Sequence, residues 1–335
     1  MKINKSNNAG YHKIHFRLEN LWIILLVVSI FFFHTSCKIR PSSERHYADG
    51  NPDKEYKLRL NPAAGSKYYF TIISGSEFRM EVDGKKVDKQ NKSTIGVSYA
   101  IDKDSAGNFR LSMVYDKIHF YSKNKDGETD LDAGDSASLD PVEKLMGILK
   151  GATIQSVVSP QGDIRSIKGY DELKSKLLAS FNPNDRYSRA IAEKQWEERI
   201  KEGLIKKNME QLFKIFPDSA VHVGDKWQLS SVQKDEINLN IKNSYTLKDI
   251  HDGVALINSE GIITSDNATG TTMGYEFTAD IKGKQEGEFE METATGMLLS
   301  SKISSDIEGE MSMMGRTIPI TIRSTMKMEG KKVNR

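Results

Sequence analysis

Histidine is the side chain most often used for acid–base catalysis at neutral pH, and it is also the commonest metal ligand. Four histidines, His46, His119, His222 and His251, lie beyond the first forty residues, and no two have the spacing of an HExxH metal site. The chain also lacks a CxxC pair, a GxSxG nucleophile elbow and a glycine-rich phosphate loop. We therefore expect no catalytic residue, no metal, no cofactor and no enzyme activity; a metal site built from distant histidines is the weaker alternative.

Carboxylates are concentrated in residues 122–138, which we predict to be an acidic loop. Hard cations such as Ca²⁺ bind several oxygen ligands. With Gly127 at position six of an EF-hand loop, Ser122 takes position one and Ala133 position twelve, so the bidentate glutamate is missing. A flexible polar loop is the better interpretation, and an irregular cation site is the alternative.

Thioether sulfur could bind Cu(I), and five methionines lie close together near the C-terminus. They are Met311, Met313, Met314, Met326 and Met328. Met326 and Met328 continue the alternating pattern that begins at Ile318, and methionine fills irregular cores well. We interpret them as core residues of a strand.

The tripeptide Asp-Ser-Ala occurs three times, with its serine at Ser105, Ser136 and Ser219. All three copies fall in predicted loops. They resemble the O-glycosylation acceptor of exported proteins in one large bacterial group. Because Asp-Ser also favours turns, three ordinary turns are the alternative.

The single cysteine, Cys37, follows the uncharged apolar stretch 21–33, and four basic residues precede that stretch. A basic flank, a short apolar run and small residues before the cut are typical of a secretory signal peptide. The segment resembles a bacterial lipoprotein signal, with residues 1–36 removed and Cys37 lipidated. An uncleaved anchor and a buried thiol are the alternatives. By the same resemblance, Lys38 favours the outer membrane, and the basic residues that follow favour the periplasmic leaflet.

Cleavage would remove 4 of 48 basic and 1 of 46 acidic residues, leaving 44 and 45. This balance argues against nucleic-acid binding, which needs clustered basic residues. It also leaves the lipid on Cys37 as the membrane attachment.

Hydrophobic periodicity predicts the organisation of the chain. Residues 37–55 are polar and predict a tether. Residues 56–168 alternate with period two around one short helix at 140–150, residues 169–216 have helical periodicity with a doubtful point at Gly203, and residues 217–332 alternate again. The expected fold is mainly β (α+β), with two antiparallel halves forming a large curved sheet, a sandwich or an open barrel, and a helical block in the middle. Asp83-Gly84 predicts a hairpin, and Gly253, Gly283, Gly296 and Gly315 mark further turns.

The two β-rich halves contain similar segments. Residues 65–70 (GSKYYF) parallel 224–229 (GDKWQL), and the turn at 160–162 (PQG) parallels that at 294–296 (ATG). A duplication is one interpretation; chance similarity between alternating sequences is the other.

Short motifs occur in order along the chain: Asp135-Ser136, the 160–162 turn, Phe216-Pro217, the 223–227 segment (VGDKW) and the 294–296 turn. In this order they resemble a family of bacterial envelope lipoproteins known only as a domain of unknown function. The resemblance covers roughly residues 55–330. It implies an envelope lipoprotein and assigns no catalytic residue.

These observations favour a non-enzymatic, lipid-anchored envelope protein that binds or chaperones an apolar ligand, such as a lipid or glycolipid, on a concave sheet face. The alternative is a structural or protein-interaction module, an accessory subunit of an envelope complex. The carrier predicts a wide internal apolar face, whereas the module predicts an exposed apolar patch. The oligomeric state is not predicted.

Overall fold

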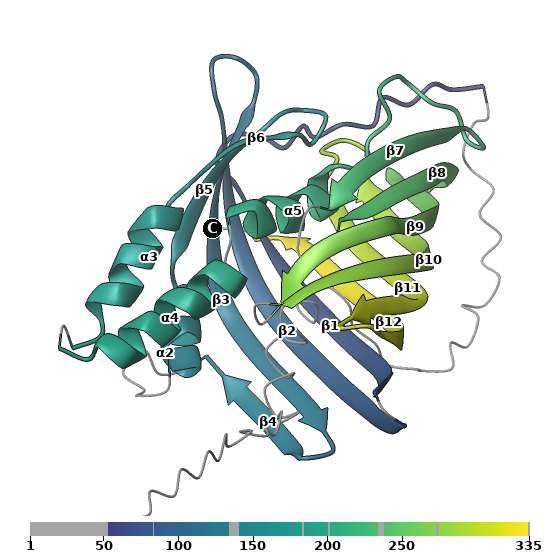
Figure 1. Ribbon diagram of the computed structural model, residues 1–335. Coiled ribbons are helices and arrows are strands. Elements are labelled where there is room, and N and C mark those ends of the chain that lie inside the picture. Colours follow the sequence, from purple (N-terminus) through teal and green to yellow (C-terminus); the bar gives the residue numbers. More distant parts are fainter. Residues whose placement is uncertain are drawn as a thin grey trace, which may run out of the picture.

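The computed structural model describes residues 53–82, 84–133, 141–182, 184–199, 202–233, 238–272 and 275–333. Most of these residues form strands (Figure 1). The strands are β1 Ser66–Val82, β2 Lys85–Lys103, β3 Phe109–Asn124, β4 Gly127–Asp132, β5 Thr153–Val158, β6 Ile164–Lys168, β7 Lys226–Gln233, β8 Leu239–His251, β9 Val254–Thr272, β10 Tyr275–Glu292, β11 Leu298–Met313 and β12 Arg316–Lys332. The helices are α2 Pro141–Leu149, α3 Tyr170–Ala179, α4 Arg186–Arg199 and α5 Glu202–Phe213.

All twelve strands belong to one antiparallel sheet, which is not closed. Its order is β6-β5-β3-β2-β1-β12-β11-β10-β9-β8-β7, and β4 pairs with β3. The two predicted β-rich halves therefore meet where β1 pairs with β12. This single sheet confirms the expected mainly β fold and selects the curved sheet over the sandwich.

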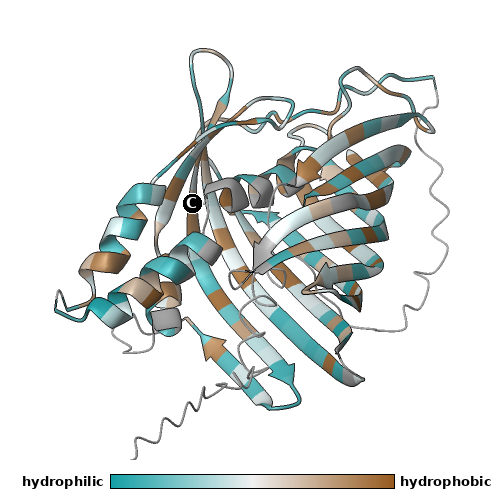
Figure 2. Cartoon of the chain, in the orientation of Figure 1, coloured by the Kyte–Doolittle hydropathy of each residue, from teal (hydrophilic) through white to brown (hydrophobic). Residues whose placement is uncertain are grey.

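Alternating side chains and tight turns explain why these segments form long hairpins. Apolar and polar residues alternate along the strands (Figure 2). Between β8 and β9, Asp252 and Gly253 both have positive φ, as do Met314 and Gly315 between β11 and β12. Two such residues form the tight hairpin loop whose twist suits the flanking strands. The predicted turns at 253 and 315 are confirmed, and the hairpin at 83–84 is confirmed by the pairing of Val82 with Lys85.

Gly283 is the exception, because the predicted turn there is wrong. This glycine lies within β10, where it pairs with Ile263 and Ile307. A Cβ at this position would come within 2.7 Å of Cγ1 of Ile307, so the neighbouring side chain leans over the glycine. A glycine inside a strand marks close packing here and not a chain reversal.

The acidic segment at 122–138 is only partly a loop. Residues up to Asn124 extend β3, and Gly127–Asp132 form β4, so the two strands make a hairpin. Exposed cross-strand pairs support it: Nε2 of His119 lies 2.7 Å from Oδ1 of Asp130, and the Tyr121 hydroxyl donates to Glu128 at 3.0 Å. The side chains of both hairpin strands are exposed on this face. The sequence of β4 therefore lacks the alternation of apolar and polar residues that would predict a strand.

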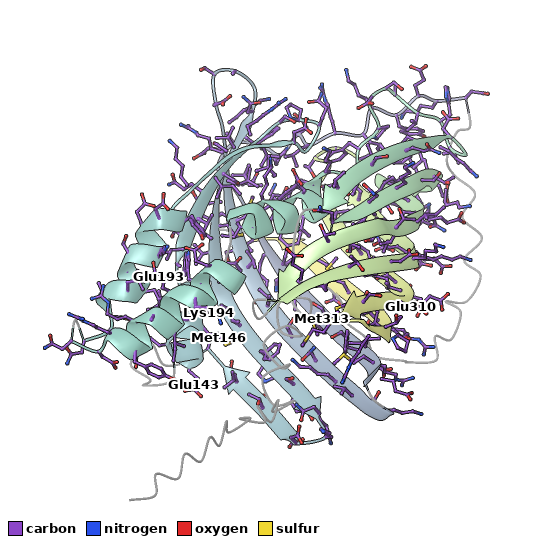
Figure 3. All side chains as sticks on the ribbon, viewed as in Figure 1. Glu143, Met146, Glu193, Lys194, Glu310 and Met313 are labelled. Atoms are coloured by element: carbon purple, nitrogen blue, oxygen red, sulfur yellow. The ribbon has the colours of Figure 1, made fainter. Side chains whose placement is uncertain are left out.

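The helices form where the helical periodicity places them. Pro141 opens α2, as proline favours the first turn of a helix. Helix α2 packs against α3 and α4, and Figure 3 labels Met146 on α2 and Glu193 and Lys194 on α4. The doubtful point at Gly203 lies within α5, and residues 200–201, between α4 and α5, fall outside the described residues.

Candidate functional site

The sheet has one buried face, called the inward face below, and its apolar side chains form two clusters. The first apolar cluster joins the strands to the helices and includes Tyr68, Phe70, Tyr99, Phe213 and Phe289. The second apolar cluster lies at the opposite end of the strands and includes Phe78, Ile263, Phe277, Ile307 and Ile322. In Figure 3, Met313 marks the second cluster, whereas Glu310 on the same strand is exposed.

A single row of residues, called the polar row below, crosses the inward face between the two clusters. From β8 to β3 it consists of Asn243, Gly261, Gln285, Ser305, Ser324, Ser76, Asn91 and Ser122. Each residue pairs with the next across neighbouring strands. Every position in the row is either polar or glycine. The adjacent row on the side of the second apolar cluster is largely apolar, whereas half of the adjacent row on the other side is serine or glycine, namely Ser259, Gly287, Ser74 and Ser93.

The β1–β3 part of the polar row satisfies its own hydrogen bonds. The Ser122 hydroxyl donates to Oδ1 of Asn91 at 2.8 Å, and Nδ2 of Asn91 donates to the Ser76 hydroxyl at 3.0 Å. Ser305 and Ser324 are bonded to each other through their hydroxyls. Asn91 is 1% exposed, so these bonds offset the loss of water around its amide.

The β8–β10 part of the polar row is not satisfied. Oδ1 of Asn243 and the hydroxyl oxygen of Ser259, a neighbour of the row, are buried without a hydrogen-bond partner. Nδ2 of Asn243 donates to the Tyr245 hydroxyl over a long 3.5 Å. Burial raises the pKa of Tyr245 to about 12, so its hydroxyl keeps its proton at neutral pH. An unpaired buried acceptor costs about 1–3 kcal/mol of stability, so the unpaired Oδ1 of Asn243 destabilises the fold when no ligand is bound.

Two glycines explain how these polar atoms fit the inward face. A Cβ on Gly261 would lie 2.1 Å from Oδ1 of Asn243, and a Cβ on Gly287 would lie 2.5 Å from the Ser259 hydroxyl. The two side chains therefore lie flat over glycine backbone. Any larger residue at either glycine would displace them.

Beside the polar row, the middle of the inward face carries apolar side chains that are only partly buried. This set, called the central apolar patch below, consists of Ile72, Ile95, Ile118, Phe120, Ile303 and Met326. The first three form one row across β1, β2 and β3. Phe70, one position along the same face from Ile72, is 2% exposed. Ile72, Ile95 and Ile303 pack against the first apolar cluster, so the patch extends that cluster on the inward face and keeps partial access to solvent.

The first apolar cluster is closed by α5 and the chain that follows it. The Phe213 ring meets the Tyr99 ring of β2 edge-on, with centroids 5.9 Å apart. Two residues later, the Ile215 carbonyl accepts a hydrogen bond from the indole of Trp227 in β7 at 3.0 Å. One short segment thus contacts the same face of β2 and β7, which are far apart in the strand order, so the inward face is concave (Figure 1).

The N-terminal segment 56–61 completes this closure. Tyr56 forms a bridge with Val221. The amide of Leu60 donates to the Pro160 carbonyl at 2.8 Å, and the next amide, of Asn61, donates to the Thr295 carbonyl at 2.7 Å. The turns at 160–162 and 294–296, which look alike in sequence, therefore hold the same segment. The duplication itself stays a prediction.

Charge on the inward face is limited. Burial raises the pKa of Tyr99 far above its ordinary value, so the first apolar cluster stays neutral there. Lys89 is 3% exposed on the inward face of β2, where it pairs with Phe78. It interacts with another group and lies on the opposite half of the sheet from Tyr245.

The residues predicted from sequence as sites lie away from this face. Cys37, Ser136 and His46 fall outside the described residues. Ser105 is exposed in the turn between β2 and β3, and Ser219 is exposed in the bend after Pro217. Both serines are open to solvent, as an acceptor must be, and their glycosylation stays a prediction.

The described histidines are separate from one another, each beside a carboxylate. Besides the His119–Asp130 pair, Nδ1 of His222 lies 3.3 Å from Oδ2 of Asp225, and Nε2 of His251 lies 3.0 Å from Oδ2 of Asp252. The backbone amide of His222 also donates to Asp225 and lowers the pKa of that carboxyl. Within the described ranges, no three His, Cys, Asp or Glu side chains come together as metal ligands would.

The predicted core role is confirmed for three of the five methionines, and Met326 is only partly buried. Met311, Met313 and Met328 are buried, whereas Met314 is 61% exposed in a turn. Sequence reasoning missed the polar row. Its signal was present as serine and asparagine at positions of the alternating pattern where apolar residues were expected, such as Ser74 and Ser76 between Ile72 and Phe78.

Among the helices of the described residues, none combines the length and apolar character needed to cross a membrane. No curated protein matches the chain. Solved structures that resemble it include an outer membrane channel from Pseudomonas putida F1, at 5% identity over 81% of this chain and 97% of that one, with a TM-score of 0.24. Pseudomonas aeruginosa OccK7 matches at 6% identity over 80% and 99% of the two chains, with a TM-score of 0.21. The translocator domain of the autotransporter NalP from Neisseria meningitidis matches at 6% identity over 81% and 90%, with a TM-score of 0.20.

The family comparison is the informative one. Residues 106–298 match the "Family of unknown function (DUF6263)". The match runs from the turn before β3 to the first residue of β11 and includes every helix described above. It covers more than half of the chain, which therefore belongs to this family of unknown function.

Proposed function

We propose that this protein is a non-enzymatic, lipid-anchored protein of the cell envelope that binds or chaperones an apolar ligand on the inward face of its sheet. A lipid or a glycolipid is the class of ligand that the face suits. The lipid on Cys37 would hold the protein at the outer membrane, facing the periplasm.

The observation that carries this proposal is the central apolar patch. A closed core leaves its inward side chains nearly inaccessible, as at Phe70 and Tyr99, which are both 2% exposed. Ile72, Ile95 and Ile118 point the same way and yet are only partly buried. An apolar ligand lying across them would remove this surface from water, with a gain of about 25 cal/mol for each Å² of apolar area.

The alternative, a protein-interaction module, predicts one continuous apolar patch on the outside. The exposed large apolar residues of the strands are instead dispersed. Ile73 on β1 pairs with Lys327, and Ile262 on β9 lies between Lys242 and Lys284. Lysines on both sides of an exposed isoleucine keep that surface hydrated, so the inward face is the better candidate.

Native mass spectrometry tests the proposal. The chain with Cys37→Ser is expressed in its own envelope, purified without detergent, and weighed under native and denaturing conditions. A ligand carrier should show a reproducible added mass that disappears in organic solvent. A bare protein, or one recovered only with another polypeptide, would refute ligand binding and favour the interaction module.

A second variant connects the added mass to the central apolar patch. Ile95→Asp places a charge in the middle of the patch and should abolish the added mass. Ile262→Asp is the matched control, because it makes the same change at an exposed isoleucine on the outward face. If both variants keep the ligand, it binds elsewhere.

A further inference from the structure

We propose that the polar row is a head-group site, and that the ligand is an amphiphile whose neutral head group carries hydroxyl groups, such as a glycosyl or glyceryl lipid. The inference rests on the proposed function, since it places the chain of the ligand on the central apolar patch. It adds the chemical class of the head group and the residues that recognise it.

Unpartnered polar atoms place the site at the β8–β10 end of the row. The Ser259 side chain is 4% exposed, and its hydroxyl has no partner; Oδ1 of Asn243 is buried and has none either. The two positions are close, because Ser259 pairs with Tyr245, two residues along β8 from Asn243. A ligand that supplies their missing partners would be held at two points.

Access to the site comes from its half-buried members. Asn243 and Gln285 are each partly exposed and flank Gly261 in the polar row. Glycine contributes no side chain between the two amides, although the Asn243 amide now lies over it. A rotation of the Asn243 side chain would uncover Gly261 and let a head group approach the backbone there.

The chemistry of these atoms selects the class of head group. A carbonyl oxygen such as Oδ1 of Asn243 only accepts hydrogen bonds, so its partner must be a donor. A hydroxyl group can donate to Asn243 and accept from Ser259 or Tyr245, whereas a dianionic phosphate has no proton to donate. The four polar side chains around the site, Asn243, Tyr245, Ser259 and Gln285, are all neutral. None of these four side chains carries a positive charge that would balance the negative charge of a phosphate group.

The site lies next to the surface that would hold the acyl chain. Ser259 pairs with Gly287, Gly287 with Ile303, and Ile303 with Met326, so the site leads along one row to the central apolar patch. Neighbouring strands are about 4.8 Å apart, so Ile303, two strands from Ser259, lies about 10 Å away from it. An amphiphile can therefore occupy both at once.

Calorimetric titration of the full chain with Cys37→Ser tests the inference with three probes that share one oleoyl chain. Monooleoylglycerol carries two hydroxyls, methyl oleate carries none, and oleoyl lysophosphatidic acid carries one hydroxyl and a phosphate. Monooleoylglycerol should bind about tenfold more tightly than methyl oleate, as expected for one or two additional buried hydrogen bonds. Lysophosphatidic acid should bind more weakly than monooleoylglycerol, because a phosphate whose charge the neutral side chains do not balance replaces one of the two hydroxyls.

In Ser259→Ala and Asn243→Leu, the ratio of the affinity for monooleoylglycerol to the affinity for methyl oleate should fall close to one. The affinity for methyl oleate itself should stay unchanged. Ser156→Ala is the matched control. Its hydroxyl is equally buried and unpartnered on β5, outside the polar row, and its loss should leave the preference intact. Removing an unpaired hydroxyl should not destabilise the protein, so the thermal midpoint of each serine variant should stay equal or rise.

The outcomes separate the two proposals. If methyl oleate binds and no variant changes the preference, the head-group site is wrong while the carrier function stands. If lysophosphatidic acid binds most tightly, the site recognises charge and the inference is likewise refuted. If none of the three probes binds, while the native protein carries no added mass, the proposed function itself fails.

Discussion

Replacing Gly162 with alanine should destabilise the protein far more than its place in a short turn between two strands suggests. Gly162 has φ of +83°, which an L-residue adopts only with strain. A Cβ there would also lie 1.8 Å from the carbonyl oxygen of Phe213 and 2.5 Å from its carbonyl carbon. The obstacle is the backbone at the end of α5, which cannot rotate away as a side chain would.

The magnitude follows from a matched control. Gly315 has φ of +74° and nothing within 4 Å of its hypothetical Cβ, so Gly315→Ala reports backbone strain alone, about 1–2 kcal/mol. Gly162→Ala adds the displacement of Phe213 from the first apolar cluster, for which overpacking typically costs about 1–3 kcal/mol. The free energy of unfolding should therefore fall by roughly 2–5 kcal/mol for Gly162→Ala.

Urea unfolding followed by tryptophan fluorescence measures both variants. The slope of free energy against urea should stay constant if the same surface is exposed on unfolding. Equal losses for the two variants would refute the close approach of the 160–162 turn to α5. Gly296→Ala should behave like Gly162→Ala, since a Cβ there would lie 2.1 Å from the Arg59 carbonyl oxygen.

Three further predictions concern the anchor, the closure and pH. Cys37→Ser should move the protein from the membrane fraction to the soluble fraction in cell fractionation; continued membrane retention would contradict lipidation. Trp227→Phe removes the indole bond to Ile215 and should lower the urea-derived stability by about 1 kcal/mol, whereas no change would mean that the bond does not hold the closure. Because burial raises the folded-state pKa of Tyr245 to about 12, stability should be constant below pH 10 and fall by about 1.4 kcal/mol per pH unit from this residue between pH 10 and 12. Urea midpoints at pH 8 and pH 11 should differ less in Tyr245→Phe, and an identical difference would exclude this tyrosine as a source of alkaline destabilisation.

Local patterns in the sequence were sufficient for most elements of the fold. The alternation of Ile318, Ile320 and Ile322 predicts β12, and the Asp83-Gly84 pair predicts the turn between β1 and β2. These signals depend on residues near one another in the chain. Strand β4 and Gly283 show where such signals fail, because β4 has no buried face to pattern and the role of Gly283 depends on Ile307 in another strand.

The pairing of β1 with β12 was beyond sequence reasoning for a related reason. Tyr68 of β1 pairs with Lys332 of β12, and no local feature of either strand indicates which strand is its partner. The polar row depends on that pairing, since Ser76 and Ser324 become neighbours only through it. A set of residues that is continuous on the sheet is thus scattered along the sequence from Ser76 to Ser324.

The polar row bears on function because stability alone does not account for it. On the side of the second apolar cluster, the next inward residues along the strands of Ser76, Ser305 and Ser324 are Phe78, Ile307 and Ile322, and apolar residues in place of the serines would extend that cluster. The β1–β3 part of the row satisfies its hydrogen bonds, which offsets the burial, but Asn243 at the other end and the neighbouring Ser259 do not. Local departures from good packing and full hydrogen bonding tend to mark functional sites, where a ligand supplies what the protein lacks. The unsatisfied end of the row adjoins the partly buried central apolar patch, so the two departures are best explained together, by one ligand with a polar end and an apolar end.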